Sequence, residues 1–328
     1  TWSIVNAPTG TVQLWTIDFN SQGVGLAVGA SSQVWRSTDF GNTWTLITGF
    51  PSTSITFYSG RFGSDNVAYI SGGSGYFFKS TDAGLTWETA GYRFTSQRIR
   101  DISFADNNNG YIVGTNLVAR SSDGGKTWTE GVKPYTGDIS EVVALTPNIA
   151  VAGCGDGNIL RTTDGGATWQ QVITGISGTN STILAIDFAD ENFGLAAAYN
   201  GTVVRTTDGG ATWSIISTIV GTSPWDMHMV TPTHAWVAGT GERIFKTSDG
   251  GFNWVQQLAV GGLGTYGISF VDTLRGVAGG TGGNTYYTDD GGVTWSPAVI
   301  PPQQTVWGIH MASSPVYGTV AMTACASG

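Results

Sequence analysis

The chain repeats one eight-residue motif seven times, and this repeat limits its fold more than any other feature. Two copies of the motif, TTDGGATW at 162–169 and 206–213, are identical. The other copies are STDFGNTW (37–44), STDAGLTW (80–87), SSDGGKTW (121–128), TSDGGFNW (247–254) and TDDGGVTW (288–295). The tryptophans that end successive copies are 41 to 44 residues apart. A period near 40 residues is typical of proteins that stack repeated supersecondary units.

The segments between the motifs predict four short strands in each repeat. The first repeat supplies LWTIDF (14–19), GLAVGA (25–30), QVWRSTD (33–39) and WTLI (44–47). The residues alternate with the period of a strand, and no helical period is present. Four antiparallel strands per repeat of about 41 residues are typical of β-propeller blades. We therefore expect an all-β chain in which residues 1–328 form a single β-propeller domain.

The motif itself has the residues of a hairpin turn between the third and fourth strands. Its Asp is suited to accept backbone N–H groups of its own turn, and the Gly two positions later accommodates a positive φ. Its Trp begins the outermost strand and is expected to cover the sheet edge there. We expect these residues to stabilise turns and to perform no chemistry. They are Asp39, Asp82, Asp123, Asp164, Asp208, Asp249 and Asp290, with Trp44, Trp87, Trp128, Trp169, Trp213, Trp254 and Trp295.

The pattern S/T-x-D-x-G-x-T-W resembles the Asp-box, or BNR, repeat. This repeat occurs in sialidases, sortilin-type receptors, xyloglucan-degrading hydrolases and many secreted propellers. The longer unit ISFADNNNGYIVGTNLVARSSDGGKTW (102–128) is most similar to the photosystem II stability/assembly factor group of propellers. The resemblance spans the whole chain and implies the propeller fold, but it leaves the activity open.

The repeats contain eight first strands and seven motifs. The first strands are expected to end at Phe19, Phe62, Phe104, Leu145, Phe188, Met229, Phe270 and Met311. TWSIV (1–5) aligns with the outermost strand TWTLI (43–47), so we expect it to complete a blade that the C-terminal segment begins. This arrangement predicts eight blades closed by the N-terminal strand. Seven blades is the alternative, because ACASG (324–328) makes a poor strand and the assembly-factor group is expected to have seven.

The charge balance disfavours nucleic acid as a partner. Fourteen Lys and Arg residues oppose 23 Asp and Glu residues, which gives a net charge of −9. Phosphate backbones would repel such a surface. No apolar run reaches the length of a membrane span. Loops rich in Ser, Thr, Gly and Asn favour an extracytoplasmic protein that is secreted, on the cell surface or periplasmic. The resemblance to the assembly factors would place it in the thylakoid lumen.

The sequence lacks a convincing catalytic constellation. Box-containing sialidases use three arginines, a Tyr–Glu pair and an acidic general acid. Here six of the 14 cations recur at one position of the third strand, which marks a structural position: Arg36, Lys79, Arg120, Arg161, Arg205 and Lys246. Glycoside hydrolysis needs two carboxylates about 5–9.5 Å apart, and no pair remains once the motif Asp residues are set aside. We expect no enzyme. If there is an activity, it should be that of a glycoside hydrolase.

The three histidines do not form a metal motif. His228, His234 and His310 lack the HxH or HExxH spacing, so no metal or other cofactor is expected. His310 and Asp18 occupy equivalent positions on first strands that should be neighbours. We expect them to make a polar contact with each other.

One row of residues predicts a binding surface. Four residues before the end of each first strand, the series reads Trp15, Tyr58, Arg100, Glu141, Leu184, Trp225, Tyr266 and Trp307. The aromatic members lie on consecutive blades and would form an asymmetric face for a sugar ring or an apolar protein segment. Packing between blades is the interpretation that the sequence favours over binding, because both sheet faces are buried there. The residues that we assign to this candidate binding surface are Trp15, Tyr58, Trp225, Tyr266, Trp307 and Arg100.

Three functions remain compatible with these features. The first is a non-catalytic scaffold that binds a protein partner or a larger extracytoplasmic assembly. The second is a carbohydrate-binding or degenerate hydrolase-like propeller with a glycan ligand. The third is a role in photosystem assembly, which only the family resemblance implies.

Overall fold

The computed structural model describes residues 13–50, 54–89, 96–262, 264–298, 305–314 and 318–325. The chain divides into two compact units: unit 1 contains residues 1–95 and 263–328, and unit 2 contains residues 96–262. The regular structure of the described residues is β-strand, apart from short 3-10 turns at Gly73–Gly75 and Thr281–Gly283. Within the same residues, no helix has the length and apolar character needed to cross a membrane.

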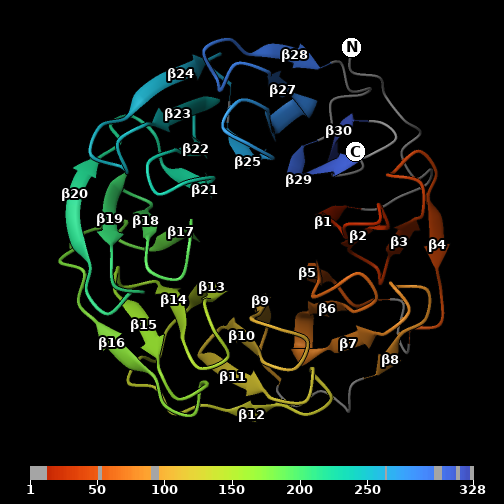
Figure 1. Cartoon of the computed structure of the whole chain (residues 1–328). Coiled ribbons are helices and arrows are strands. Elements are labelled where there is room, and N and C mark those ends of the chain that lie inside the picture. The colour runs from red at the N-terminus through yellow and green to blue at the C-terminus, as the bar shows by residue number, and fades with distance from the viewer. Residues whose placement is uncertain are drawn as a thin grey trace. The chain divides into compact units, whose positions relative to one another are not determined.

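Unit 2 consists of four antiparallel sheets, each with four strands in chain order (Figure 1). Its first strands β9, β13, β17 and β21 pack side by side. The sheets are β9 (Ile99–Phe104), β10 (Gly110–Gly114), β11 (Leu117–Ser121) and β12 (Thr129–Glu130); β13 (Ile139–Ala144), β14 (Ala150–Cys154), β15 (Ile159–Thr162) and β16 (Gln170–Val172); β17 (Ile183–Phe188), β18 (Gly194–Ala198), β19 (Thr202–Thr206) and β20 (Ser214–Thr218); and β21 (Pro224–Met229), β22 (Ala235–Gly239), β23 (Arg243–Thr247) and β24 (Val255–Ala259).

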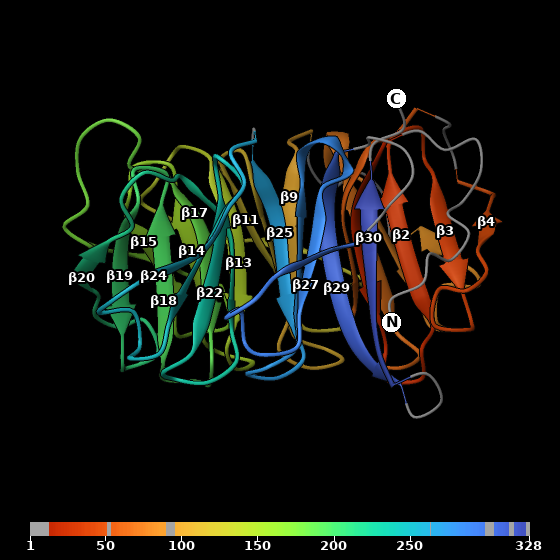
Figure 2. The same cartoon turned by 90° about the horizontal axis from the view of Figure 1, so that it is seen from above.

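Unit 1 contains three sheets of the same kind and one two-stranded hairpin. The sheets are β1 (Leu14–Phe19), β2 (Gly25–Gly29), β3 (Val34–Ser37) and β4 (Thr45–Ile47); β5 (Phe57–Phe62), β6 (Ala68–Gly72), β7 (Phe77–Ser80) and β8 (Glu88–Thr89); and β25 (Thr265–Phe270), β26 (Gly276–Gly280), β27 (Thr285–Thr288) and β28 (Ser296–Ala298). The hairpin pairs β29 (Val306–Ser314) with β30 (Gly318–Cys325), drawn in blue in Figure 2. Strand β29 contacts both β25 and β1.

The expectation of eight blades was wrong, because the described residues form seven four-stranded blades. The segment expected to begin an eighth blade forms only the hairpin β29–β30. The segment TWSIV, which was expected to close the last blade, lies outside the described residues. The part of the chain that the structure describes is therefore a β-propeller with seven four-stranded antiparallel blades.

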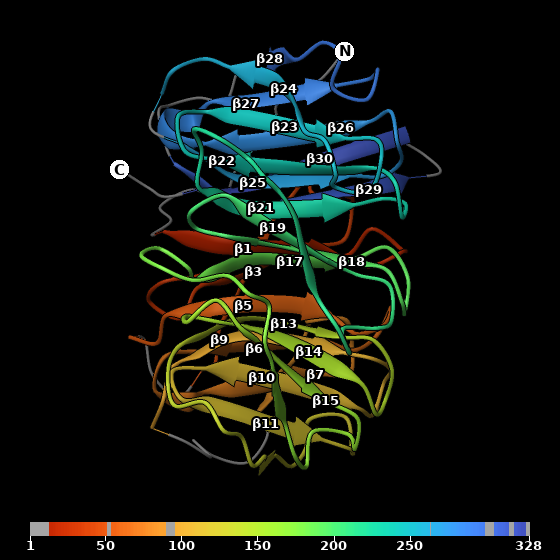
Figure 3. The same ribbon diagram turned by 90° about the vertical axis from the view of Figure 1, so that its left-hand side faces the viewer.

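Burial explains why each strand has its own composition. The second strands, such as β10 (GYIVG) and β14 (AVAGC), are buried along their whole length. Both faces of such a strand lie against neighbouring sheets, so it carries small and apolar residues without polar alternation. The fourth strand β20 (SIIST) is exposed at most positions. Figure 3 shows three strands of one sheet in yellow. They are the first strand β9, the second strand β10 and the third strand β11, which pair in this order.

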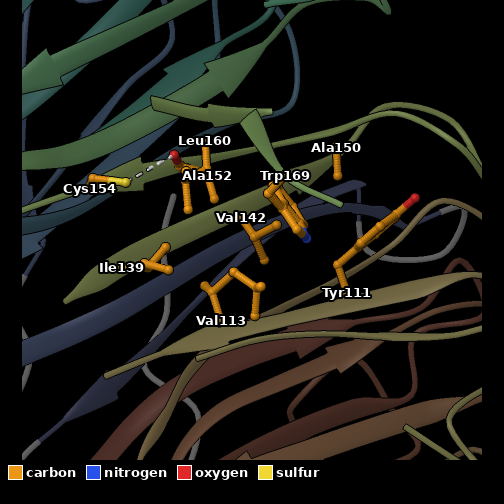
Figure 4. Packing of buried hydrophobic residues seen from close by; sticks show 10 residues of the cluster. Tyr111, Val113, Ile139, Val142, Ala150, Ala152, Cys154, Leu160 and Trp169 are labelled. Carbon is orange, nitrogen blue, oxygen red and sulfur yellow. Dashed lines mark hydrogen bonds between the residues drawn. The ribbon is translucent and has the colours of Figure 1, made fainter. Parts of the chain in front are cut away.

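The core lies between consecutive sheets. In unit 2, side chains from the sheet β9–β12 interdigitate with side chains from the sheet β13–β16 (Figure 4). Val113 and Tyr111 come from β10, whereas Val142 and Leu160 come from β13 and β15. The ring of Trp169 meets Tyr111 edge to face at 6.0 Å. An Asp-box tryptophan therefore packs against the preceding blade and joins two blades into one core.

The Asp-box turns share one hydrogen-bond pattern. In the fourth box, the carboxylate of Asp164 accepts the backbone N–H of Thr168 at 2.9 Å and its hydroxyl at 2.6 Å. The hydroxyl of Thr162 donates to Asp164 and accepts the N–H of Gly166 at 2.9 Å. The corresponding bonds recur in the boxes at Asp39, Asp82, Asp123, Asp208, Asp249 and Asp290. Each box is therefore a self-contained turn in which one carboxylate closes the loop.

Two consecutive left-handed residues follow the box Asp. Sequence reasoning identified only the second, such as Gly166 with φ of 89°. The residue before it is also left-handed, and it is Gly in five boxes but Phe40 and Ala83 in the other two, with φ of 55° and 56°. A non-glycine residue in this region is strained. The first two boxes therefore tolerate strain that the glycine pairs avoid.

We expect Asp164→Ala to lower the free energy of unfolding by about 1–2 kcal/mol, because Thr168 loses its acceptor. Asp164→Asn keeps one oxygen acceptor, so its free energy of unfolding should fall by less than that of the Ala variant. Urea unfolding of the three proteins measures the difference. Equal midpoints for the wild type and the Ala variant would contradict the turn role.

Acid should weaken the same turns. The hydroxyl and N–H of Thr168 lower the pKa of Asp164 to about 2, below the ordinary value of 3.8. Because the folded state prefers the ionised carboxylate, its contribution is complete above about pH 4 and is lost as the pH falls toward 2. The melting temperature, measured from pH 5 to pH 2, should fall over this range. The fall should be smaller in Asp164→Asn, which has no carboxyl to titrate at this position.

Candidate binding surface

A β-bulge interrupts the start of each first strand. In β1 the pairing with β2 passes from Leu14 to Thr16, which leaves Trp15 without a cross-strand partner. The same skip occurs in β5, β9, β13, β17, β21, β25 and β29. A bulge bends the strand and redirects the side chain of the extra residue. The row that the sequence singled out is therefore the row of bulge residues.

The fourth repeat corrects that row by one position. Its bulge residue is Ser140 and its first strand ends at Ala144, whereas the sequence alignment placed Glu141 in the row and ended the strand at Leu145. The bulge residues are Trp15, Tyr58, Arg100, Ser140, Leu184, Trp225, Tyr266 and Trp307. Glu141 belongs to the next row, with Asp101 and Asp226.

Four aromatic bulge residues of unit 1 contact one another in a continuous series. Tyr266 stacks on Trp307 with centroids 4.7 Å apart and planes 17° apart. Trp307 meets Trp15 at 5.1 Å and 43°, and Trp15 meets Tyr58 at 6.0 Å and 54°. They come from the neighbouring strands β25, β29, β1 and β5 (Figure 1). We call Tyr266, Trp307, Trp15 and Tyr58 the aromatic ladder.

The ladder rings are half-buried, so part of each ring faces outward. The indole Nε1 atoms of Trp15 and Trp307 are buried, and neither has a hydrogen-bond partner. The polar edge of each indole is therefore turned inward. The accessible part of these two rings is apolar, which suits contact with an apolar ligand surface.

The other two sequence-predicted binding residues lie in unit 2. Trp225 is 36% exposed and meets Tyr199 edge to face at 5.8 Å. Arg100 donates from Nη2 to Asp138 at 2.6 Å, and its Nε is buried without a partner. Four of the six predicted binding residues therefore form the ladder in unit 1. The other two lie in unit 2 and do not belong to it.

The first strands of unit 2 carry an acidic group that the sequence analysis missed. It contains Asp101, Glu141, Asp187 and Asp226, one from each sheet. Burial and the neighbouring charge of Asp101, followed by Asp226, raise the pKa of Glu141 well above 4.5. For Asp101, Glu141 and Asp226 the signal in the sequence was an acid one residue after the bulge position, and the misplaced register of the fourth repeat concealed it. Asp187 lies three residues after its bulge residue. No group of ligands suited to a metal ion occurs among the residues that the structure describes.

These acids bind backbone N–H groups of the next first strand. Asp101 accepts the N–H of Val142 at 3.1 Å, and Glu141 accepts the N–H of Ile186 at 3.0 Å. Asp187 accepts the N–H of Met229 at 2.7 Å. Such bonds give these three carboxylates a structural role.

The remaining polar candidates also have structural partners. His310 Nδ1 lies 3.0 Å from Asp18 Oδ1, which confirms the expected contact. Asp18 also accepts the N–H of Phe62 at 2.7 Å. Among the third-strand cations, Arg36 donates to the carbonyl of Ala83 and Arg161 to that of Gly209. Both carbonyls belong to the next Asp-box turn, so these arginines join consecutive blades.

We expect Glu141→Gln to stabilise the chain at pH 7.5. In the unfolded wild type the Glu141 carboxyl ionises freely above about pH 4.5, while burial and Asp101 oppose its ionisation in the folded state. The free energy of unfolding of the wild type is therefore lower by about 1.4 kcal/mol for each unit by which the pKa is raised. Gln retains an oxygen for Ile186 N–H and does not ionise. Urea unfolding should show a gain at pH 7.5 that disappears at pH 4, whereas Glu130→Gln, at an exposed position of β12, should show neither.

Comparison with known sequences identifies two matching segments. Residues 87–173 match the family described as photosynthesis system II assembly factor YCF48, and residues 286–297 match the BNR/Asp-box repeat. The first segment runs from the second Asp-box tryptophan to β16 and contains the 102–128 unit. No curated protein matches the chain.

Solved structures with the same fold include two YCF48 propellers. A structure described as YCF48 bound to D1 peptide is 19% identical, with a TM-score of 0.65 and coverage of 86% of this chain and 92% of that one. YCF48 from Cyanidioschyzon merolae is 19% identical, with a TM-score of 0.64 and coverage of 98% and 95%. The C-terminal WD40 domain of Sif2 is 11% identical, with a TM-score of 0.75 and coverage of 99% and 97%. The repeats, the fold and the matching segments together identify the chain as an Asp-box β-propeller similar to the photosystem II assembly factor group.

Proposed function

We propose that this chain is a non-catalytic scaffold that holds a peptide segment of a partner protein during assembly of a larger complex. The observation that carries the proposal is the match of residues 87–173 to the YCF48 assembly-factor family. A YCF48 structure with a similar fold is described as bound to a D1 peptide, which supports a peptide as the ligand class here. Photosystem assembly is the specific role that follows from this similarity.

The bonding of the carboxylates supports a scaffold over an enzyme. A glycoside hydrolase needs one carboxyl as a general acid and a second one free to act as a base or nucleophile. Asp101, Glu141 and Asp187 each accept a backbone N–H of a neighbouring strand. Each Asp-box carboxylate is held by its own turn. Their protonation or movement during catalysis would therefore break bonds that maintain the fold.

An extracytoplasmic location is part of the proposal. A net charge of −9 and the sparse lysines agree with a protein that works away from nucleic acid. For a photosystem assembly role, the compartment would be the thylakoid lumen. A scaffold there would bind segments that a membrane partner exposes on that side.

A glycan is the second candidate ligand, because half-buried aromatic rings also suit the apolar faces of sugars. The aromatic ladder is the observation that favours it. A glycan array therefore belongs beside any peptide test. Binding there, with no peptide binding, would replace the proposed function with carbohydrate recognition.

The experiment is a titration of the full chain with overlapping synthetic peptides that cover D1, followed by fluorescence anisotropy. We expect at least one peptide to bind with a Kd in the micromolar range, at least about tenfold tighter than its scrambled version. The WD40 domain of Sif2, which has a similar fold, serves as the control and should bind no D1 peptide. Absence of binding to every D1 peptide, or hydrolysis of an oligosaccharide by the chain, would contradict the proposal.

A further inference from the structure

We propose that the aromatic ladder is a docking site for a proline-rich segment in the polyproline II conformation. The inference rests on the proposed function, since it names the kind of peptide that the scaffold holds. It concerns unit 1 alone and the rings of Tyr266, Trp307, Trp15 and Tyr58.

The spacing of the rings fits this conformation. Steps of 4.7 and 5.1 Å separate Tyr266 from Trp307 and Trp307 from Trp15. The alternate rings Tyr266 and Trp15 are therefore no more than about 10 Å apart, while residues i and i+3 of a polyproline II helix lie about 9 Å apart on one side. Successive turns of such a helix would meet alternate rings. Prolines also stack well on aromatic side chains, and the preformed helix loses little entropy on binding.

The charge around the ladder selects an uncharged segment. None of the four ladder residues is charged, and the residues that follow them are the small, neutral Thr16, Ser59, Gly267 and Gly308. In unit 2 the same row carries Asp101, Glu141 and Asp226. An acidic row attracts basic ligands, whereas a neutral row beside aromatic rings gives no advantage to a charged one.

The polar groups near the ladder disfavour a sugar. The indole N–H groups of Trp15 and Trp307 are buried, as are the hydroxyls of Thr16 and Ser59. A bound sugar would lose water from its hydroxyls and find none of these four groups accessible. A proline-rich segment has few N–H donors to satisfy. Although the rings also suit the apolar faces of sugars, the apolar contact that the ladder offers therefore favours proline over a glycan.

The test is calorimetric titration of the full chain with capped decaproline. A capped Gly-Ser decapeptide and cellohexaose are the comparison ligands. We expect decaproline to bind at least about tenfold tighter than the Gly-Ser peptide, and cellohexaose not to bind. Trp307→Ala and Trp15→Ala should each weaken decaproline binding about tenfold, which corresponds to about 1.4 kcal/mol. Trp225→Ala is the matched control, because it removes an aromatic bulge residue outside the ladder and should leave the affinity unchanged.

A second measurement avoids dependence on the stability of the Ala variants. In the chain labelled with 5-fluorotryptophan, the fluorine resonances of Trp15 and Trp307 are assigned from Trp→Phe variants. Decaproline should shift these two resonances and leave that of Trp225 in place. Equal affinity for the two peptides, binding of cellohexaose alone, or shifts confined to other tryptophans would overturn the inference.

The two proposals fail separately. If a D1 peptide binds and Trp307→Ala leaves its affinity unchanged while decaproline does not bind, the scaffold function stands and the ladder inference is wrong. If decaproline binds at the ladder and no D1 peptide binds, the ladder inference stands and the assembly role is wrong.

Discussion

The first strand of each blade is an open sheet edge, and its backbone N–H groups are satisfied by side chains of the neighbouring first strand. In unit 1, Asp18 accepts the N–H of Phe62 and Ser269 accepts that of Met311. In unit 2, Ser103 and Asp187 do the same for Ala144 and Met229. An unpaired buried N–H costs about 1–3 kcal/mol, so a short acceptor such as Asp or Ser at this position stabilises the contact between blades. The polar residues at this position connect neighbouring blades. A carboxylate on a first strand is therefore explained by this contact and is not evidence of catalysis.

The bulge residue lies three residues before this acceptor. Its side chain does not have to accept an N–H group of the neighbouring strand. This residue has no cross-strand partner, and its side chain is directed away from the regular pairing of the sheet. The bulge position holds very different residues, and the strands around it pair in the same way in each case. Examples are Trp15, Arg100, Ser140 and Leu184. A site of recognition placed at the bulges therefore changes its chemistry at little cost to the fold.

The sequence predicted the strands and turns because their residues are local. The Asp, Gly and Trp of each box stabilise a turn within eight residues, so spacing alone located it. Register was harder to predict. In four blades a Phe that ends the first strand packs over a Gly that begins the second, as Phe19 does over Gly25, and this pair marks the strand end. The fourth repeat has Ala144 opposite Ala150 instead, and the bulky Leu145 shifted the alignment by one residue. The blade count failed for a non-local reason: β29 looks like any other first strand, yet among the described residues it and β30 form a sheet of two strands only.

Turn residues and N–H acceptors stabilise the fold, whereas the bulge residues do not. This separation of roles also explains how the propeller fold is kept at very low sequence identity. The YCF48 propellers are 19% identical to this chain, whereas the WD40 domain, at 11%, gives a higher TM-score. The fold needs turn residues, acceptors for edge N–H groups and small residues in buried second strands, and different sequences meet these needs. Fold similarity therefore carries little information about ligands. Under the docking proposal, that information lies in the bulge row and the row after it, which are aromatic and neutral in unit 1 but largely acidic in unit 2. Because the turns and acceptors hold the blades, the residues of these two rows differ in chemistry from blade to blade while the strands around them keep their pairing.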